Sequence, residues 1–240
     1  MPTDITRRAF VQLAACGLAS FHLHGSQPAM TATAAVDHLL LGVPDLETGI
    51  GWVEQRTGVR AVVGGVHPGR GTRNALIALA GRHYLEILAP DPAQEGGGRA
   101  DLLALREPRL ITWAAVATDI GSLATRVRAA GLSAPGPRPG SRARPDGRLL
   151  EWTTIGIESA FASGGIDPLP FFIQWAPGSP HPSQDSPRGC ALTSLEFEHP
   201  DADRLRDTLS RLGIDAATRE GKAVRIAAAL TAPKGRLVLT

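Results

Sequence analysis

The stretch Val36-Asp37-His38-Leu39-Leu40-Leu41-Gly42-Val43-Pro44-Asp45-Leu46 sets a pattern that the rest of the chain follows. Its apolar run predicts a strand. Asp45 is a favourable N-cap, and Leu46, Ile50 and Val53 follow it at helical spacing. Gly58 is a typical residue for ending such a helix. The stretch therefore predicts a strand followed closely by an amphipathic helix.

The same strand-to-helix pattern returns twice along the chain. Ile111–Ile120 contains Asp119 at the point where a helix would start, and Ser194–Asp201 ends on a third such aspartate. Gly131 and Gly213 then stand where these two helices would end. An internal repeat accounts for all three segments.

The runs that follow each predicted helix complete the units. After the first helix, apolar runs separated by glycine-rich turns predict three strands, at Val59–Val66, Thr72–Ala80 and Arg82–Leu88. After the second helix, a Pro-, Gly- and Arg-rich stretch hides one strand, and two more are predicted at Leu149–Ile157 and Leu169–Trp175. After the third helix only Ala223–Leu230 and Gly235–Thr240 are predicted as strands. The fold class is therefore α+β: paired βαβββ modules, at about 35–90 and 110–177, with a third partial βαββ unit at about 190–240.

Composition narrows the class of function. The 240 residues include 27 Gly and 19 Pro, which favours many turns and short elements over a helical bundle. A net charge of +2 without a basic stripe argues against a nucleic-acid partner. Two cysteines exclude a disulfide framework. The body of the chain contains no apolar stretch long enough to predict a stable membrane span.

The first thirty residues differ from the body, which we take as one domain, 31–240. Arg7-Arg8 stands before a weakly apolar run, Ala9–Leu23, as in a twin-arginine export signal, and Ala32-Thr33-Ala34 fits a cleavage site. Residues 1–30 are therefore expected to be a leader that sends the protein to the periplasm. The alternative is a cytoplasmic protein whose translation starts at Met30.

Strand alternation identifies a candidate site within the first unit. His38 in the first strand and Glu86 in the last can both face the concave side of the sheet. A buried glutamate is costly without a partner, and imidazole with carboxylate is a suitable donor pair for a divalent metal. The alternatives are a simple His–Glu hydrogen bond and an exposed Glu86.

Several motifs in these units resemble the vicinal oxygen chelate superfamily and, within it, the glyoxalase-like domain proteins. The residues that carry the resemblance are Asp37-His38-Leu39, Gly65–Leu76, Tyr84–Pro92, Arg144–Trp152 and Pro170–Trp175. The resemblance covers about 35–240 and implies the glyoxalase/bleomycin-resistance-like fold. Two units would form a cup with one metal near its floor.

In that family a His from the first strand and a Glu from the fourth strand of each unit hold the metal. His38 and Glu86 match these positions, and the second unit offers Thr112 and Gln174 instead. The resemblance therefore implies a zinc, nickel, manganese or iron site formed by His38, Glu86 and Gln174, although Thr and Gln are weak ligands for such metals.

Four other residues are candidates for contact with a substrate, and one for catalysis beside Glu86. His67 and Asn74 flank a glycine-rich turn at the expected mouth of the cup, and His67 is taken with Glu86 as catalytic. Thr112, Trp152 and His181 complete the substrate-binding candidates, with a solvated loop as the alternative for His181.

Two functions follow from this set of residues. One is a metal-dependent lyase, isomerase or dioxygenase that acts on a small substrate with two vicinal oxygens. The other is a non-catalytic protein that binds or sequesters a small molecule in the same cup. The expected partner is a small-molecule ligand, with a homodimer left open.

Overall fold

The two predicted βαβββ units are present in the structure, a computed structural model that describes residues 29–94 and 100–240. The first unit consists of β2 (Val36–Gly42), α2 (Leu46–Thr57), β3 (Val62–His67), β4 (Thr72–Ala78) and β5 (Tyr84–Pro90). The second consists of β6 (Arg109–Val116), α4 (Ile120–Ala129), β7 (Arg138–Ala143), β8 (Leu149–Ile155) and β9 (Phe171–Trp175). Two short helical segments lie outside the units, α3 (Ala100–Leu103) before β6 and the 3₁₀ helix η1 (Pro182–Gln184) after β9.

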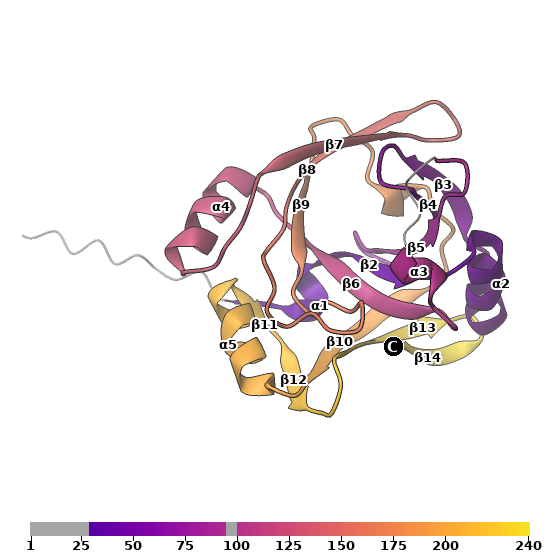
Figure 1. The fold of residues 1–240 in the computed structure, drawn as a ribbon. Helices are drawn as coiled ribbons and strands as arrows, with labels where there is room; N and C mark the ends of the chain where they lie inside the picture. Colours follow the sequence, from indigo (N-terminus) through magenta and orange to yellow (C-terminus); the bar gives the residue numbers. More distant parts are fainter. Residues whose placement is uncertain (1–28, 95–99) are drawn as a thin grey trace, which may run out of the picture.

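The two units share one eight-stranded sheet in the order β3-β4-β5-β2-β6-β9-β8-β7. In each unit the first strand pairs in parallel with the last, β2 with β5 and β6 with β9. The units meet where β2 pairs antiparallel with β6. Figure 1 shows that the sheet curls strongly, so that the edge strands β3 and β7 approach each other and contact across the open side. The sheet therefore encloses a cup.

All three predicted helices start at the expected aspartates. Asp45 accepts a hydrogen bond from the backbone N–H of Thr48 (2.8 Å), and Asp119 accepts one from that of Ser122 (3.0 Å). Asp201 caps α5 (Ala202–Arg211) in the same way. The backbone turns into the left-handed region just after each helix, where a residue without a Cβ is favoured, and the glycines there are Gly58, Gly131 and Gly213.

The third segment also begins with a strand and a helix, but it has one more strand than each of the units and its strands pair differently. Its strands are β10 (Ala191–His199), β11 (Ile214–Asp215), β12 (Ala217–Glu220), β13 (Arg225–Ala232) and β14 (Gly235–Leu239). Four of these form a separate sheet in the order β12-β10-β13-β14, in which β10 pairs in parallel with β12 and antiparallel with β13. β12, the second strand after the helix, therefore lies in parallel beside β10, whereas in the first unit the last strand lies in parallel beside β2.

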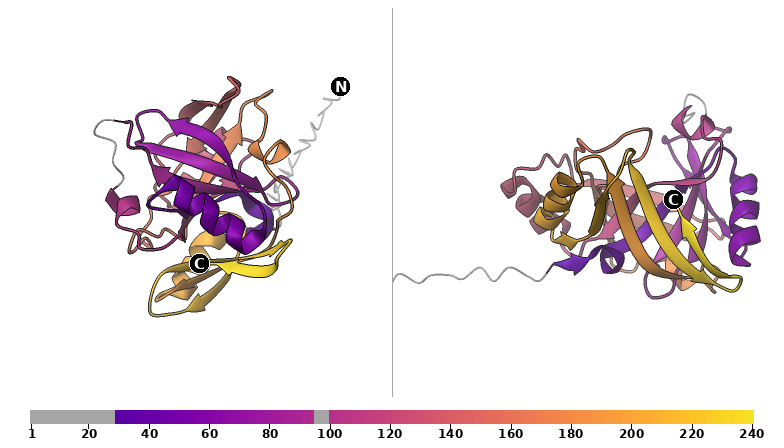
Figure 2. Two further views of the ribbon diagram at one scale, coloured as in Figure 1. Left: turned by 90° about the vertical axis from the view of Figure 1, so that its right-hand side faces the viewer. Right: turned by 90° about the horizontal axis from the view of Figure 1, so that it is seen from below.

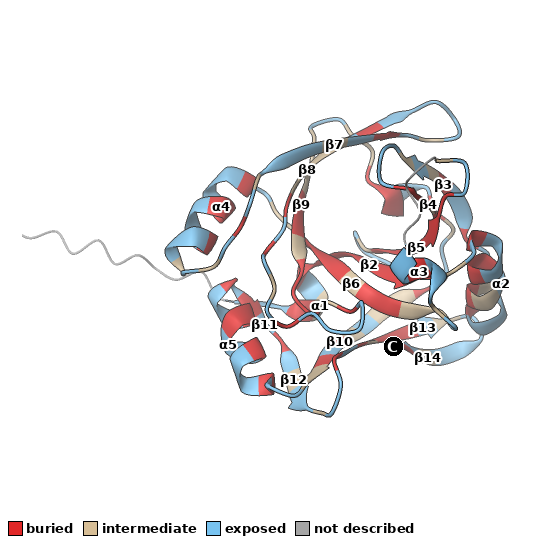
Figure 3. Ribbon diagram, in the orientation of Figure 1, coloured by how far each residue is buried: buried red, intermediate tan, exposed pale blue. Residues whose placement is uncertain are grey.

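The main hydrophobic core lies between the outer face of the cup and this third sheet. Leu39 and Leu41 of β2 face this core, while His38 and Leu40 face the inside of the cup. Trp113 of β6 is fully buried and lies against Phe197 of β10, with ring centres 5.7 Å apart. Figure 2 shows the third sheet as a layer beside the curled sheet, and Figure 3 shows that the strands between them are buried. The third segment thus covers the outside of the cup and leaves its interior free.

The start of the described chain is part of the fold. β1 (Met30–Thr31) pairs in parallel with β11, and α1 (Ala32–Ala35) buries Ala32 and Ala35. The hydroxyl oxygen of Thr33 accepts a hydrogen bond from the backbone N–H of Leu195 (3.1 Å). The twin-arginine motif and the apolar run of the leader lie outside the described residues. Within the described part of the chain, no helix is long and apolar enough to cross a bilayer.

This arrangement predicts different results for two truncations. A chain that starts at Met30 should melt within about 1 °C of the full chain, because β1 and α1 remain. A chain that starts at Val36 loses the Thr33–Leu195 hydrogen bond and two buried alanines. Its melting temperature should fall by roughly 5 °C or more. Thermal unfolding followed by circular dichroism measures both, and equal melting temperatures would show that cleavage at Ala32-Thr33-Ala34 is compatible with the fold.

Candidate active site

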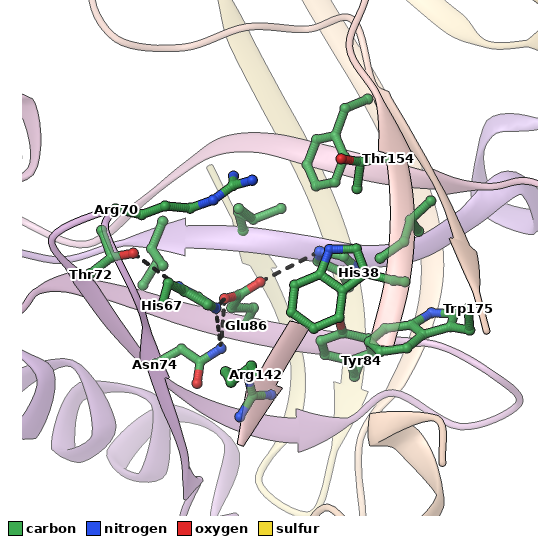
Figure 4. Close-up of a pocket in the computed structure, with 15 residues that line it drawn as sticks. His38, His67, Arg70, Thr72, Asn74, Tyr84, Glu86, Arg142, Thr154 and Trp175 are labelled. Atoms are coloured by element: carbon green, nitrogen blue, oxygen red, sulfur yellow. Dashed lines mark hydrogen bonds and ion pairs between the residues drawn. The ribbon is translucent and has the colours of Figure 1, made fainter. Parts of the chain in front are cut away.

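A cavity of about 170 Å³ opens inside the cup. Its volume is close to the roughly 150 Å³ that accommodates one benzene ring in an engineered protein cavity. The first unit contributes most of the polar lining and the second unit most of the aromatic lining (Figure 4). The lining residues are His38, Leu40, His67, Arg70, Thr72, Asn74, Tyr84, Glu86, Leu88, Arg142, Trp152, Thr154, Phe171, Ile173 and Trp175.

His38 and Glu86 meet on the floor of this cavity. The Nε2 atom of His38 lies 3.4 Å from Oε2 of Glu86, and both side chains are buried. The pairing of β2 with β5 places Leu40 beside Glu86 and His38 beside Tyr84, so all of these side chains lie on one face. The ring of Tyr84 stacks on that of His38, with centres 4.5 Å apart. The predicted convergence of His38 and Glu86 is confirmed, and their role as metal ligands stays a prediction.

The second oxygen of Glu86 faces the turn between β3 and β4. Asn74 donates a hydrogen bond to Oε1 (2.7 Å), and Nε2 of His67 lies 3.6 Å from the same oxygen. Nδ1 of His67 is engaged by Oγ1 of Thr72 at 2.9 Å. Sequence reasoning placed His67 and Asn74 at the mouth of the cup, and the structure brings both into contact with Glu86. Figure 4 shows Glu86 between the two imidazoles.

The charge states of these groups follow from burial and from their neighbours. Burial alone would raise the pKa of Glu86, but His67, His38 and the hydrogen bond from Asn74 bring it below its usual value. Burial lowers the pKa of His67, although Glu86 opposes this shift. At neutral pH Glu86 is therefore an anion and His67 a neutral imidazole.

Asp37 holds His38 from behind, and sequence reasoning missed this residue. Its Oδ1 lies 2.8 Å from Nδ1 of His38, and its Oδ2 accepts hydrogen bonds from Trp175 (3.0 Å) and from Nε2 of His181 (3.2 Å). Burial alone would raise the pKa of Asp37, but the hydrogen bonds from His181 and His38 lower it well below its usual range. Adjacent residues of a regular strand face opposite sides, but the register with β6 shifts between Val36 and His38 and allows this contact.

His181 is neither a solvated loop residue nor part of the cavity lining, so both expectations for it were wrong. It is fully buried, where it begins η1. Its Nδ1 accepts a hydrogen bond from the backbone N–H of Ser183 (3.3 Å), which leaves the proton on the Nε2 that faces Asp37. The position is fixed by the packing of η1 and not by any local pattern in the sequence.

The second unit does not supply the ligands that were expected from it. Phe171, Ile173 and Trp175 line the cavity, so Gln174 between them faces away. The Oε1 atom of Gln174 accepts a hydrogen bond from the backbone N–H of Ile120 (2.8 Å) at the start of α4. The hydroxyl of Thr112 is directed to the carbonyl of Leu169 (3.5 Å), and Thr112 is not among the lining residues. The predictions of Gln174 as a metal ligand and Thr112 as a substrate contact were therefore wrong.

The remaining lining combines aromatic walls with one buried cation. Trp152 lines the cavity as predicted, and Trp175 lies beside it with ring centres 5.6 Å apart. Arg142 of β7 is 4% exposed and donates a hydrogen bond to the carbonyl of Gly64 in β3. It therefore joins the two edges of the curled sheet as well as lining the cavity.

The family of the chain is shown by a domain model. Residues 36–213 match the model of the glyoxalase-like domain, which is more than half of the chain. The chain belongs to the glyoxalase-like domain family. This confirms the resemblance to the vicinal oxygen chelate superfamily and the fold that it implied.

Solved structures with a similar fold extend this comparison. A hypothetical protein from Staphylococcus aureus is 15% identical with a TM-score of 0.60, over 79% of this chain and 87% of that one. Methylmalonyl-CoA epimerase from Mycobacterium tuberculosis is 23% identical with a TM-score of 0.46, over 63% of this chain and 94% of that one. No curated protein matches the sequence. At these identities the first comparison supports the fold, and the function has to be argued from the site.

The donors in this glyoxalase-like cup fit a divalent metal in their chemistry. Two imidazole nitrogens and one carboxylate face each other, which is a common donor set for iron, manganese, zinc and nickel. Each imidazole has its Nδ1 engaged by an outer oxygen, from Asp37 or Thr72, as is usual for metal-binding histidines. Within residues 29–94 and 100–240, no three His, Cys, Asp or Glu side chains lie close enough together to bind one metal ion as they stand. Binding of an ion would therefore require the imidazoles to close in on Glu86.

Proposed function

We propose that this glyoxalase-like protein is a metal-dependent enzyme of the isomerase or lyase type, acting on a small substrate with two adjacent oxygens. The observation that carries the proposal is the direction of the two imidazoles. With Nδ1 of His38 bonded to ionised Asp37 and Nδ1 of His67 bonded to Thr72, both Nε2 atoms are left to face one carboxylate, at 3.4 and 3.6 Å. The two imidazole nitrogens and the charged carboxylate then face one region, in which the Asn74 amide lies between His67 and Glu86, and a divalent cation placed there would be attracted by all three groups.

In this proposal His38, His67 and Glu86 hold the metal. A bound divalent ion polarises a substrate carbonyl and makes a neighbouring C–H bond more acidic. Asp37 keeps the proton of His38 on Nδ1, so that the lone pair of Nε2 is free to bind the metal. For His67, the amide N–H of Asn74 is directed at Nε2 (3.4 Å), which leaves the proton on the Nδ1 that contacts Thr72.

The proton is moved by Glu86, the one carboxylate that lines the described cavity. Glu86 takes the proton from the carbon that bears the hydroxyl, while the electron pair of that bond forms an enediolate with the adjacent carbonyl. Transfer of the hydroxyl proton to the former carbonyl oxygen, and return of the carbon-bound proton from Glu86 to the neighbouring carbon, complete an isomerisation without an oxidant or reductant. Tyr84 stays protonated, because burial raises its pKa well above the usual value. The aromatic walls exclude water from the enediolate.

The test uses the full chain prepared without chelator. Cobalt(II) titrated into the protein should give one bound ion per chain with a visible absorption band typical of nitrogen and oxygen ligands. The loaded protein should then exchange the CH₂ hydrogens of 2-hydroxyacetophenone for deuterium in D₂O, followed by NMR, while the metal-free protein should not. Failure to retain cobalt, zinc, nickel or manganese would overturn the proposal.

One observation favours the second function, that of a non-catalytic binding protein. The second unit contributes Arg142, Trp152, Thr154, Phe171, Ile173 and Trp175 to the described cavity, and none of these is a His, Cys, Asp or Glu. In this alternative the imidazoles and Glu86 only recognise the ligand. A protein that binds 2-hydroxyacetophenone without metal and without hydrogen exchange would support it.

A further inference from the structure

Arg142 is a buried cation that lines the cavity. Its side chain is 4% exposed, and among the described residues it forms no ion pair. Glu86 attracts it only from a distance, and the carbonyl of Gly64 is a neutral acceptor for one of its N–H groups. A guanidinium removed from water without a carboxylate beside it is costly, and the cost is offset when a ligand supplies the anion.

The charge of the residues that line the cavity also favours an anionic ligand. The charged residues that line the cavity are Arg70, Arg142 and Glu86, so its arginines outnumber its carboxylates by one. A divalent ion would add further positive charge. Figure 4 shows Arg142 and Arg70 on different sides of Glu86, so the positive charge surrounds the floor of the cavity.

The size and walls of the cavity restrict what the anion is attached to. About 170 Å³ accommodates a ring and a few further atoms, which excludes burial of a nucleotide-sized group. Trp152, Trp175 and Phe171 form an aromatic wall beside the polar floor, and Phe171 contacts the ring of His38. A planar or aromatic group fits that wall, and a short anionic head fits the floor.

We infer that Arg142 binds the carboxylate of the substrate, and that the substrate is a small acid that carries a hydroxyl beside a carbonyl and has an aromatic or branched remainder. The hydroxyl and the carbonyl are the two adjacent oxygens that the proposed function requires, and the carboxylate is a separate group that contacts Arg142. The inference rests on the proposed function for the reaction, but recognition of the carboxylate by Arg142 is testable without metal.

The experiment compares phenylglyoxylate with its methyl ester by isothermal titration calorimetry, on the metal-free and cobalt-loaded full chain. Both ligands keep the ring and two adjacent oxygens, and only the acid carries a charge. The metal-free protein should bind the acid about 10- to 100-fold more tightly than the ester, the range expected for charge-assisted hydrogen bonds to a buried guanidinium.

Variants of two arginines in the β7–β8 hairpin test whether Arg142 causes the preference for the acid over the ester. Arg142→Met should lower the affinity for the acid by about 10-fold or more and leave that for the ester within about twofold. Arg142→Lys should restore part of the loss. Arg148→Met is the matched control, because Arg148 is exposed, pairs with Asp146 and Asp185, and does not line the cavity. A single cooperative thermal transition shows that Arg142→Met folds, although loss of the hydrogen bond to Gly64 should lower its melting temperature.

The outcomes separate this inference from the proposed function. If acid and ester bind equally well to the metal-free protein, or if Arg142→Met retains the affinity for the acid, the inference is wrong, even where cobalt binds. If the acid is preferred through Arg142 but no metal is retained, the inference stands and the proposed function falls.

Discussion

Replacing Asp37 with alanine should lower the free energy of unfolding by about 3–5 kcal/mol, the largest effect on stability that we expect from any residue of the site. The Asp37 carboxylate is 1% exposed and accepts from His38, His181 and Trp175. Its removal leaves three donors without an acceptor, two of them on the buried His38 and His181 and one on the partly buried Trp175, and each unsatisfied buried group costs about 1–3 kcal/mol. Urea unfolding at pH 7 measures the change.

Two further variants make the test of Asp37 specific. Asp185→Ala removes an aspartate that pairs with Arg144 and Arg148 at the surface, and it should change the free energy of unfolding by less than about 1 kcal/mol. Asp37→Asn keeps the shape but loses the charge that holds the proton on Nδ1 of His38. It should weaken cobalt binding by about 10- to 100-fold. A loss below 1 kcal/mol for Asp37→Ala would contradict the hydrogen-bonded network described here.

Replacing Glu86 with glutamine should weaken divalent metal binding by at least about 100-fold and lower the rate of hydrogen exchange by about 10²- to 10⁴-fold. The variant keeps the size of the side chain. It removes the carboxylate on which both imidazoles converge, and with it the group that accepts the substrate proton. Cobalt titration and NMR of 2-hydroxyacetophenone in D₂O measure the two effects separately.

Gln174→Ala is the control for Glu86→Gln, because Gln174 faces away from the cavity. It should leave metal binding unchanged. It should also lower the free energy of unfolding by about 1 kcal/mol, since the backbone N–H of Ile120 loses its acceptor. If Glu86→Gln retains metal and exchange activity, then Glu86 is neither ligand nor base, and the binding function becomes the better account of the cup.

The site is unequally divided between the two units, although their folds correspond. The first unit holds His38, His67 and Glu86, and the second supplies aromatic walls and Arg142. At the inward position of β9 where a ligand was expected, Ile173 lines the cavity. If a metal binds, the second unit therefore leaves coordination positions to substrate and solvent, which suits binding of two substrate oxygens.

Much of the fold followed from local patterns in the sequence. Asp45, Asp119 and Asp201 each start a helix because a side-chain oxygen accepts from the backbone three residues on, a contact that needs no tertiary partner. The period of two along β2 and β5 placed His38 and Glu86 on one face. Strand alternation allowed both side chains to face inward, and the resemblance to the glyoxalase-like domain proteins placed them on the floor of a cup.

The tertiary structure decided what single residues do within that frame. The sequence-based alignment of β9 was wrong by one position, so Gln174 was predicted to face the cavity and in fact faces away from it. Neighbouring side chains of a strand face opposite sides, so a shift of one residue exchanges the two faces. His181 lies 144 residues from Asp37 in the chain, and only the packing of η1 brings the two together. Arg142 likewise reaches the cavity because the sheet curls until β7 meets β3. Local propensity and periodicity determine which elements form and which face each side chain lies on. The pairing of distant strands and the curl of the sheet determine which side chains share a buried site, because strand pairing and curl depend on contacts that no local stretch encodes.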